Sequence, residues 1–114
     1  LPTFSEQVGQ KISRQDDLFS FTVEPFMLEQ NGVLANGVLT EILTRITQQL
    51  MVNSGRSLII DQLMIYFFQA VQIDDLLHIQ PRIIRQTRRT AIIDFEMYLE
   101  AMLVAKATIT VKIN

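Results

Sequence analysis

Hydrophobic and polar residues alternate along four stretches of the chain, a period of two that is typical of strands with one buried face. A fifth stretch (SLIIDQLMIYFF) is apolar on both faces, which favours a central strand that is covered on both sides. Short connections join the last three alternating stretches and predict an antiparallel meander. The predicted strands are 18–24, 57–68, 76–84, 90–99 and 102–113, and Pro81 predicts an edge or a bulge within the third of them.

The segment 37–52 has the period of an amphipathic helix instead. Its apolar stripe consists of Leu39, Ile42, Leu43, Ile46 and Leu50. Asn36 is the predicted N-cap, and Asn53-Ser54-Gly55 is the predicted stop. Residues 1–17 form a polar lead-in with room for one short helix. Because a helix with one apolar stripe must be buried against a sheet, the pattern predicts a single α+β domain over residues 1–114.

The composition predicts that the chain forms an oligomer, and it argues against several classes of function. Hydrophobic residues make up 48% of the chain and charged residues 19%, which favours burial of extra apolar surface in an oligomer. The net charge of −2 argues against a nucleic-acid surface on this domain. The absence of cysteine excludes disulfides and thiolate metal sites, and one histidine leaves little room for a metal centre.

No apolar run approaches the roughly 20 residues that a membrane-spanning helix needs. No signal peptide is recognised either, so the expected location is cytoplasmic, without a membrane partner. The chain begins with Leu1 instead of methionine, and we therefore expect it to be a domain excised from a longer multidomain protein.

The order strand, loop, long helix and four strands resembles the hotdog fold, in which a curved antiparallel sheet wraps around one long central helix. The likeness covers residues 18–113 and rests on Asn31, NGVL at 36–39 with the helix after it, and the run from Met64 to Val111. It implies the fold more specifically than a function, because hotdog domains host thioesterases, dehydratases and ligand sensors. The stretches GVLTEILT and MIYFFQAVQID are similar, more narrowly, to the C-terminal hotdog domain of bacterial transcription regulators that carry DRTGG and CBS domains.

In hotdog hydrolases a backbone N–H at the start of the helix faces the thioester carbonyl, and a carboxylate farther along the helix acts as base or nucleophile. The resemblance aligns the helix-opening His-Gly-Gly of that family with Asn36, Gly37 and Val38. The carboxylate position falls on Arg45, which cannot act as a general base, and the position of an assisting Ser or Thr falls on Ile60. The donor end of the site is therefore kept, while the catalytic carboxylate is lost.

The Arg45–Glu41 pair and Asp61 can each be interpreted in two ways. Arg45 and Glu41, one turn apart, form either an exposed ion pair or part of a ligand site. Asp61 is the best substitute for the missing acid, and its other role is a structural hydrogen bond. Asn31 is assigned to the ligand site by the resemblance, together with the start of the helix.

Four arginines stand out in an acidic chain: Arg82, Arg85, Arg88 and Arg89. The resemblance implies that they meet the phosphates of coenzyme A, which guanidinium groups bind through forked hydrogen bonds. The alternative is a solubilising cluster that deters pairing at a sheet edge.

The sequence therefore predicts a non-catalytic, ligand-sensing and dimerising domain of a bacterial regulator that binds an acyl-CoA or a related CoA thioester. No cofactor or metal beyond that ligand is expected. The alternatives are an acyl-CoA thioesterase that uses Asp61 as its acid, and a purely structural dimerisation module whose pocket its own Met and Phe side chains fill.

Overall fold

A computed structural model describes residues 2–31, 33–51 and 55–114 of the chain. Within these ranges the strands form one six-stranded antiparallel sheet in the order β1-β2-β4-β5-β6-β3. The elements, in chain order, are α1 (Phe4–Gln10), β1 (Ser13–Gln15), β2 (Leu18–Thr22), the 3₁₀ helix η1 (Pro25–Met27), α2 (Asn36–Leu50), β3 (Leu58–Phe67), β4 (Leu76–Gln86), β5 (Thr90–Leu99) and β6 (Met102–Ile113).

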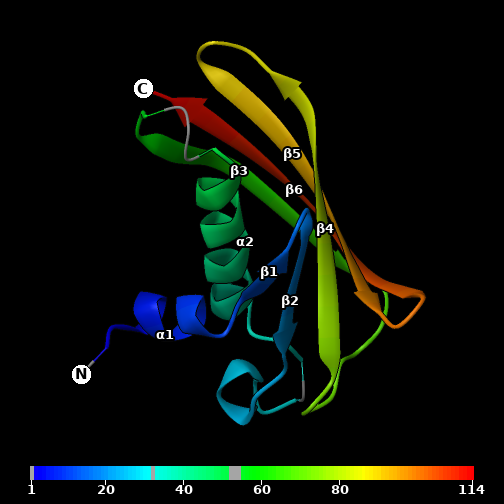
Figure 1. Cartoon of the computed structure of the whole chain (residues 1–114). Coiled ribbons are helices and arrows are strands. Elements are labelled where there is room, and N and C mark those ends of the chain that lie inside the picture. The colour runs from blue at the N-terminus through cyan, green and yellow to red at the C-terminus, as the bar shows by residue number, and fades with distance from the viewer. Residues whose placement is uncertain (1, 32, 52–54) are drawn as a thin grey trace.

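The sheet curves, and α2 lies along its concave side (Figure 1). The apolar stripe of α2 is buried because Leu39 and Leu43 pack over Phe95 in the middle of β5. The described residues confirm the predicted antiparallel sheet with a helix against it. They do not show a single helix, since α1 packs on the outer side of α2 as a second one. The predicted lead-in thus forms α1 and the short strand β1 at one edge of the sheet.

The start of α2 differs from the prediction by one residue. Ala35 is the N-cap and Asn36 is the first residue of the helix, so the Asn36 side chain does not cap it. At the other end the helix stops at Leu50, and Gly55 has the positive φ of +63° that favours glycine. Asn53 and Ser54 of the predicted stop lie outside the described residues.

The prediction that residues 57–68 form a doubly covered central strand is wrong. The strand β3 pairs only with β6 and lies at the edge of the sheet. Its side chains alternate between half-buried positions on the α2 side and exposed ones on the outer side, where Met64 and Tyr66 lie. Apolar residues on both faces therefore mark an edge strand with an uncovered outer face, together with unpaired backbone groups along its free edge.

The strand β4 shows why Pro81 is tolerated inside a sheet. Its neighbour β2 pairs with it only as far as Ile79, so β4 has a free side at Pro81, where the missing N–H breaks no ladder. A register shift follows between Ile83 and Arg85, which confirms the predicted edge or bulge in this strand.

Candidate functional site

The N-terminus of α2 is open. The N-cap Ala35 has no side-chain oxygen, and no side chain caps the first turn. The backbone N–H groups at a helix start carry partial positive charge and lack partners within the helix. A Cβ added to Gly37 would meet no atom within 4 Å, so a ligand can approach the backbone there. Asn36, Gly37 and Val38 thus present donors at an accessible helix end.

An apolar cleft of about 210 Å³ adjoins this helix end. One wall is the pair of residues just before the N-cap, and the other is the end of β3 with the segment that follows it. The lining residues are Val33, Leu34, Phe67, Phe68, Gln69, Ala70 and Val71. We call this space the apolar cleft. A ligand held there would lie beside the positive end of α2.

Asn31 contributes to the wall of the apolar cleft through its local structure. Its Oδ1 accepts a hydrogen bond of 3.1 Å from the N–H of Val33, an Asx turn that sets the chain direction before α2. Leu34 then forms a bridge with Leu28, and the Ala35 N–H donates to the Met27 carbonyl at 2.8 Å. Asn31 therefore positions the wall, although its own side chain is not among the lining residues.

Arg45 faces α1 and belongs to a polar triad with Glu41 and Ser5. Its Nε donates to Glu41 Oε1 at 3.1 Å, its Nη2 donates to Ser5 Oγ at 2.6 Å, and the Ser5 hydroxyl donates to Glu41. The side chains of Arg45 and Glu41 are only 30% and 25% exposed, so the pair is more buried than an ordinary surface pair. Arg45 stands at the position where the resemblance to hotdog hydrolases places the catalytic carboxylate. Its side chain instead attaches α1 to α2.

Gly9 of α1 lies directly against the Arg45 guanidinium, because a Cβ at Gly9 would come within 2.6 Å of Nη1. We expect Gly9→Ala alone to change stability little, since a gain of about 0.5–1 kcal/mol in helix propensity offsets the disturbed triad. In an Arg45→Ala background the same change should stabilise the domain by roughly that full gain. Urea unfolding of the four proteins of this cycle measures the difference. Equal effects in both backgrounds would show that Gly9 and Arg45 are not coupled.

Ile60 and Asp61 lie away from the start of α2 within one chain. Ile60 pairs with Val111 near the beginning of β3, whereas Phe67, at the end of β3, lines the apolar cleft. Seven residues of strand separate these positions by about 23 Å. Asp61 is exposed at the β3 bulge, and its Oδ1 lies 3.6 Å from Lys112 Nζ. The prediction that Asp61 lies on a doubly buried strand is therefore wrong, while its role as an acid stays a prediction.

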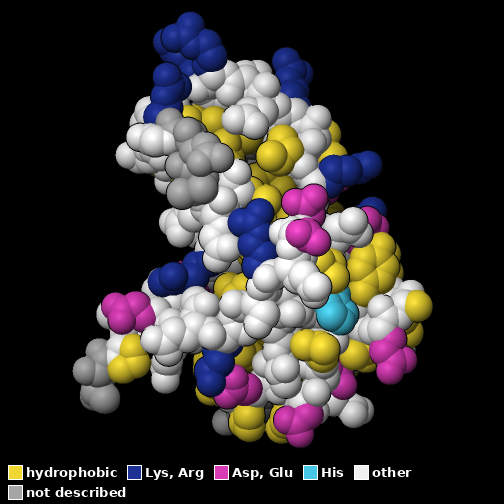
Figure 2. Space-filling model, in the orientation of Figure 1, with side chains coloured by type: hydrophobic (Ala, Val, Ile, Leu, Met, Phe, Trp, Pro, Cys, Tyr) yellow, Lys and Arg dark blue, Asp and Glu magenta, His cyan; other side chains and the backbone are white. Residues whose placement is uncertain are grey.

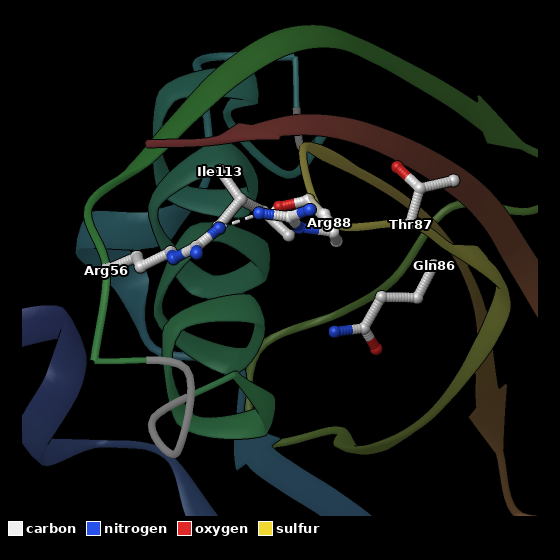
Figure 3. A pocket seen from close by; sticks show the side chains of 5 residues that line it. All are labelled: Arg56, Gln86, Thr87, Arg88 and Ile113. Atoms are coloured by element: carbon white, nitrogen blue, oxygen red, sulfur yellow. Dashed lines mark hydrogen bonds between the residues drawn. The ribbon is translucent and has the colours of Figure 1, made fainter.

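The four predicted phosphate-binding arginines separate into two locations. Arg88 and Arg89 lie at the β4–β5 turn, where Arg56 joins them from the loop before β3. Arg56 Nη1 donates to the Arg88 carbonyl at 2.9 Å (Figure 3). The cavity beside them, about 730 Å³, is lined by Arg56, Gln86, Thr87, Arg88 and Ile113, and an adjoining one adds Arg89 and Asn114. We call the two together the arginine pocket; no Asp or Glu lines it among the described residues.

Arg82 and Arg85 are placed differently. Arg82 lines a hollow on the sheet face away from α2, with Asp94, Glu96 and Lys106. Arg85 is exposed on β4 opposite Ile92. Figure 2 shows Lys and Arg side chains gathered at the end of the molecule that carries the β4–β5 turn, with Asp and Glu farther along the same face. Only part of the predicted arginine set therefore contributes to the arginine pocket.

Sequence reasoning missed Arg56, although a signal for it exists. No acidic residue occurs between Glu41 and Asp61 or between Asp75 and Asp94. The antiparallel sheet brings the acid-free loop before β3 next to the acid-free β4–β5 turn through β6, whose end pairs with both β3 and β5. Comparing acid-free segments, instead of one cluster of arginines, would have predicted Arg56 as a member.

The outer sheet face carries the one group among the described residues with a perturbed pKa. Partial burial, and next the charge and hydrogen bonding of Glu96, raise the pKa of Tyr98 above its usual value of 10.0. We expect Tyr98 to ionise above the pH of a free tyrosine, and Glu96→Gln to lower its pKa. Tyrosinate absorbance during an alkaline titration measures both, with a Tyr98→Phe variant to identify the signal. Because the folded state disfavours the tyrosinate, Tyr98 reduces stability only as the pH rises past about 10.

Two kinds of feature are not found in the described part of the chain. There, no group of three or more His, Asp or Glu side chains could hold a metal ion. None of the helices described is long and apolar enough to cross a membrane.

Some known proteins are similar to this chain in sequence, and others are similar in structure. No family model matches the sequence. An uncharacterized protein of Bacillus subtilis (YtoI) is 28% identical over 97 residues, which is 84% of this chain. The chain spans only 22% of the length of that relative. Its name gives no support to the narrower resemblance to DRTGG and CBS regulators.

Two streptococcal structures are similar over nearly the whole fold. A hypothetical thioesterase of Streptococcus pneumoniae, crystallised with coenzyme A, has a TM-score of 0.78 and 24% identity over 90% of this chain and 84% of its own. A Streptococcus mutans protein bound to acetyl CoA has a TM-score of 0.78 and 19% identity over 91% and 87%. At these identities the similarity establishes the architecture alone. The chain therefore has the six-stranded antiparallel sheet and packed helix of the hotdog fold.

Proposed function

We propose that this domain binds a CoA thioester, with the thioester at the N-terminus of α2 and the acyl group in the apolar cleft. The observation that carries the proposal is the open, uncapped helix start directly beside an apolar cleft. Backbone donors and helix dipole suit a thioester carbonyl, and the cleft suits an acyl chain. Coenzyme A bound to proteins of the same fold adds support for this ligand class.

The arginine pocket supplies the complementary half of such a ligand. Its guanidinium groups, with no Asp or Glu among the described lining residues, suit the phosphates of coenzyme A. It lies at the start of β3, however, while the apolar cleft lies at the end of the same strand, about 30 Å away by strand length. One chain alone thus separates the two halves of the proposed site.

A homodimer joined through β3 would bring the two halves together. The free edge of β3 offers unpaired backbone groups, and antiparallel pairing with a second β3 sets the start of one strand beside the end of the other. The arginine pocket of one copy would then lie near the apolar cleft of its partner. Light scattering at micromolar concentration tests this arrangement, and a monomeric mass would contradict it.

Binding and hydrolysis of the thioester are separate proposals. The thioesterase function has more support from the similar structures, one of which is named a hypothetical thioesterase. Ligand sensing without hydrolysis is supported by this chain's own residues, because Arg45 stands at the carboxylate position and Asp61 pairs with Lys112 away from the cleft. The role within a bacterial regulator stays a prediction that none of the similar proteins supports.

Two measurements separate these functions. Calorimetry of the wild-type domain with CoA and acetyl-CoA tests binding, and no heat with either at about 1 mM would overturn the proposal. Release of free thiol from acetyl-CoA tests hydrolysis. Turnover that Asp61→Asn abolishes, while Asp94→Asn retains it, would establish the thioesterase with a relocated acid. Binding without turnover would establish the non-catalytic domain.

A further inference from the structure

The size and lining of the apolar cleft restrict the acyl group, an inference that rests on the proposed function and deepens it. We propose that the domain selects CoA thioesters of short, uncharged acyl groups of about four to six carbons. It would exclude long-chain and carboxylated acyl groups. The cleft volume, the small free space within the core and the chemistry of the lining support this selection.

The volume gives the upper limit. The apolar cleft measures about 210 Å³. At about 30 Å³ for each water-sized group, it holds roughly seven non-hydrogen atoms. A hexanoyl group has six carbons and one oxygen and therefore fills the cleft. A palmitoyl group exceeds it more than twofold.

The packed core leaves little free space for a longer chain. Leu34 and Val71 of the lining are 1% and 3% exposed and belong to the core. The gap between α2 and the sheet, lined by Leu39, Leu43 and Phe95 among others, measures only about 10 Å³. That is at or below the space of a single water. A long acyl chain would have to displace core side chains or extend into water.

The lining decides the polarity of the acyl group. Six of the seven lining residues are apolar, and Gln69 is the only polar one. None of the described residues that line the cleft is a cation, so a malonyl or succinyl carboxylate inside it would be buried without a charged lining partner, which is costly. In contrast, each CH₂ added to an alkyl chain is buried in the cleft and raises the affinity about fourfold until the cleft is full.

The test is a calorimetric panel of acetyl-, butyryl-, hexanoyl-, palmitoyl- and succinyl-CoA, with free CoA as the reference, on the wild-type domain. We expect affinity to rise by about 250-fold from acetyl- to hexanoyl-CoA, which differ by four CH₂ groups. Palmitoyl-CoA should bind at least tenfold more weakly than hexanoyl-CoA, and succinyl-CoA at least tenfold more weakly than butyryl-CoA. Equal or tighter binding of palmitoyl- or succinyl-CoA would overturn the selection while leaving CoA-thioester binding intact. No binding of any member, free CoA included, would overturn the proposed function itself.

A cleft-filling variant makes the test specific to this cavity. Ala70 lines the cleft and is exposed, so Ala70→Leu should leave the fold intact while occupying part of the volume. It should weaken hexanoyl-CoA at least tenfold and acetyl-CoA less than threefold. Gln72→Leu, two residues away and outside the lining, is the matched control and should change neither. An equal loss for both esters in Ala70→Leu would overturn the assignment of this cleft to the acyl group.

Discussion

An Arg88→Ala/Arg89→Ala double variant is expected to bind coenzyme A about 10²- to 10⁴-fold more weakly than the wild-type domain. Both residues line the arginine pocket, and none of its described lining residues is an Asp or Glu that would compete with a phosphate for them. A hydrogen bond to a charged group contributes about 1.5–3 kcal/mol, so the loss of two costs about 3–6 kcal/mol. Calorimetry at low and at physiological salt measures the effect. The wild-type affinity should fall with added salt more steeply than that of the variant.

An Arg82→Ala/Arg85→Ala double variant is the matched control, because it removes the same charge from the same strand and turn region. Arg82 lies among Asp94, Glu96 and Lys106 on the other sheet face, and Arg85 lines neither part of the arginine pocket. We expect its affinity for coenzyme A to stay within about threefold of wild type, which is the scale of long-range surface charge effects. Equal losses in both double variants would mean that net charge, and not the pocket, attracts the phosphates.

These two pairs of arginines also show what sequence reasoning about a site can reach. Residue type and the acidic background were sufficient to single out all four as one group. Their separation depends on the strand, because side chains alternate between faces and because Arg82 on β4 precedes Arg88 of the following turn by six residues, about 20 Å of extended chain. Arg56 could join Arg88 only through the sheet order, which pairs segments that are distant in sequence. The order of strands in the sheet does not follow from the pattern of residues along the sequence.

The fold was more predictable than the site, for a physical reason. Periods of 2 and 3.6 are local properties, so the bounds of α2 and of the long strands follow from the sequence within about two residues. The environment of β3 is not local. Apolar residues on both of its faces suit a buried central strand and equally an edge strand with an outer face still uncovered. Arg45 shows the same limit, since its partner Ser5 lies 40 residues away.

Replacement of Phe95 by alanine is expected to be among the most destabilising single changes in this domain. Phe95 is 1% exposed in the middle of β5, between Pro81 and Ala107 on the neighbouring strands and below Leu39 and Leu43 of α2. Truncation of a buried Phe to Ala costs about 3–5 kcal/mol, a large part of a typical total of 5–15 kcal/mol. Urea unfolding should show a lower midpoint with an unchanged m-value.

The control for this prediction is the next residue along the strand. Glu96 points to the opposite sheet face, where it lines the outer hollow instead of the core, so Glu96→Ala should change stability by less than about 1 kcal/mol. Both variants are compared at one protein concentration, because dimerisation would make unfolding concentration-dependent. A loss below about 1 kcal/mol in Phe95→Ala would contradict the tight packing between α2 and the sheet.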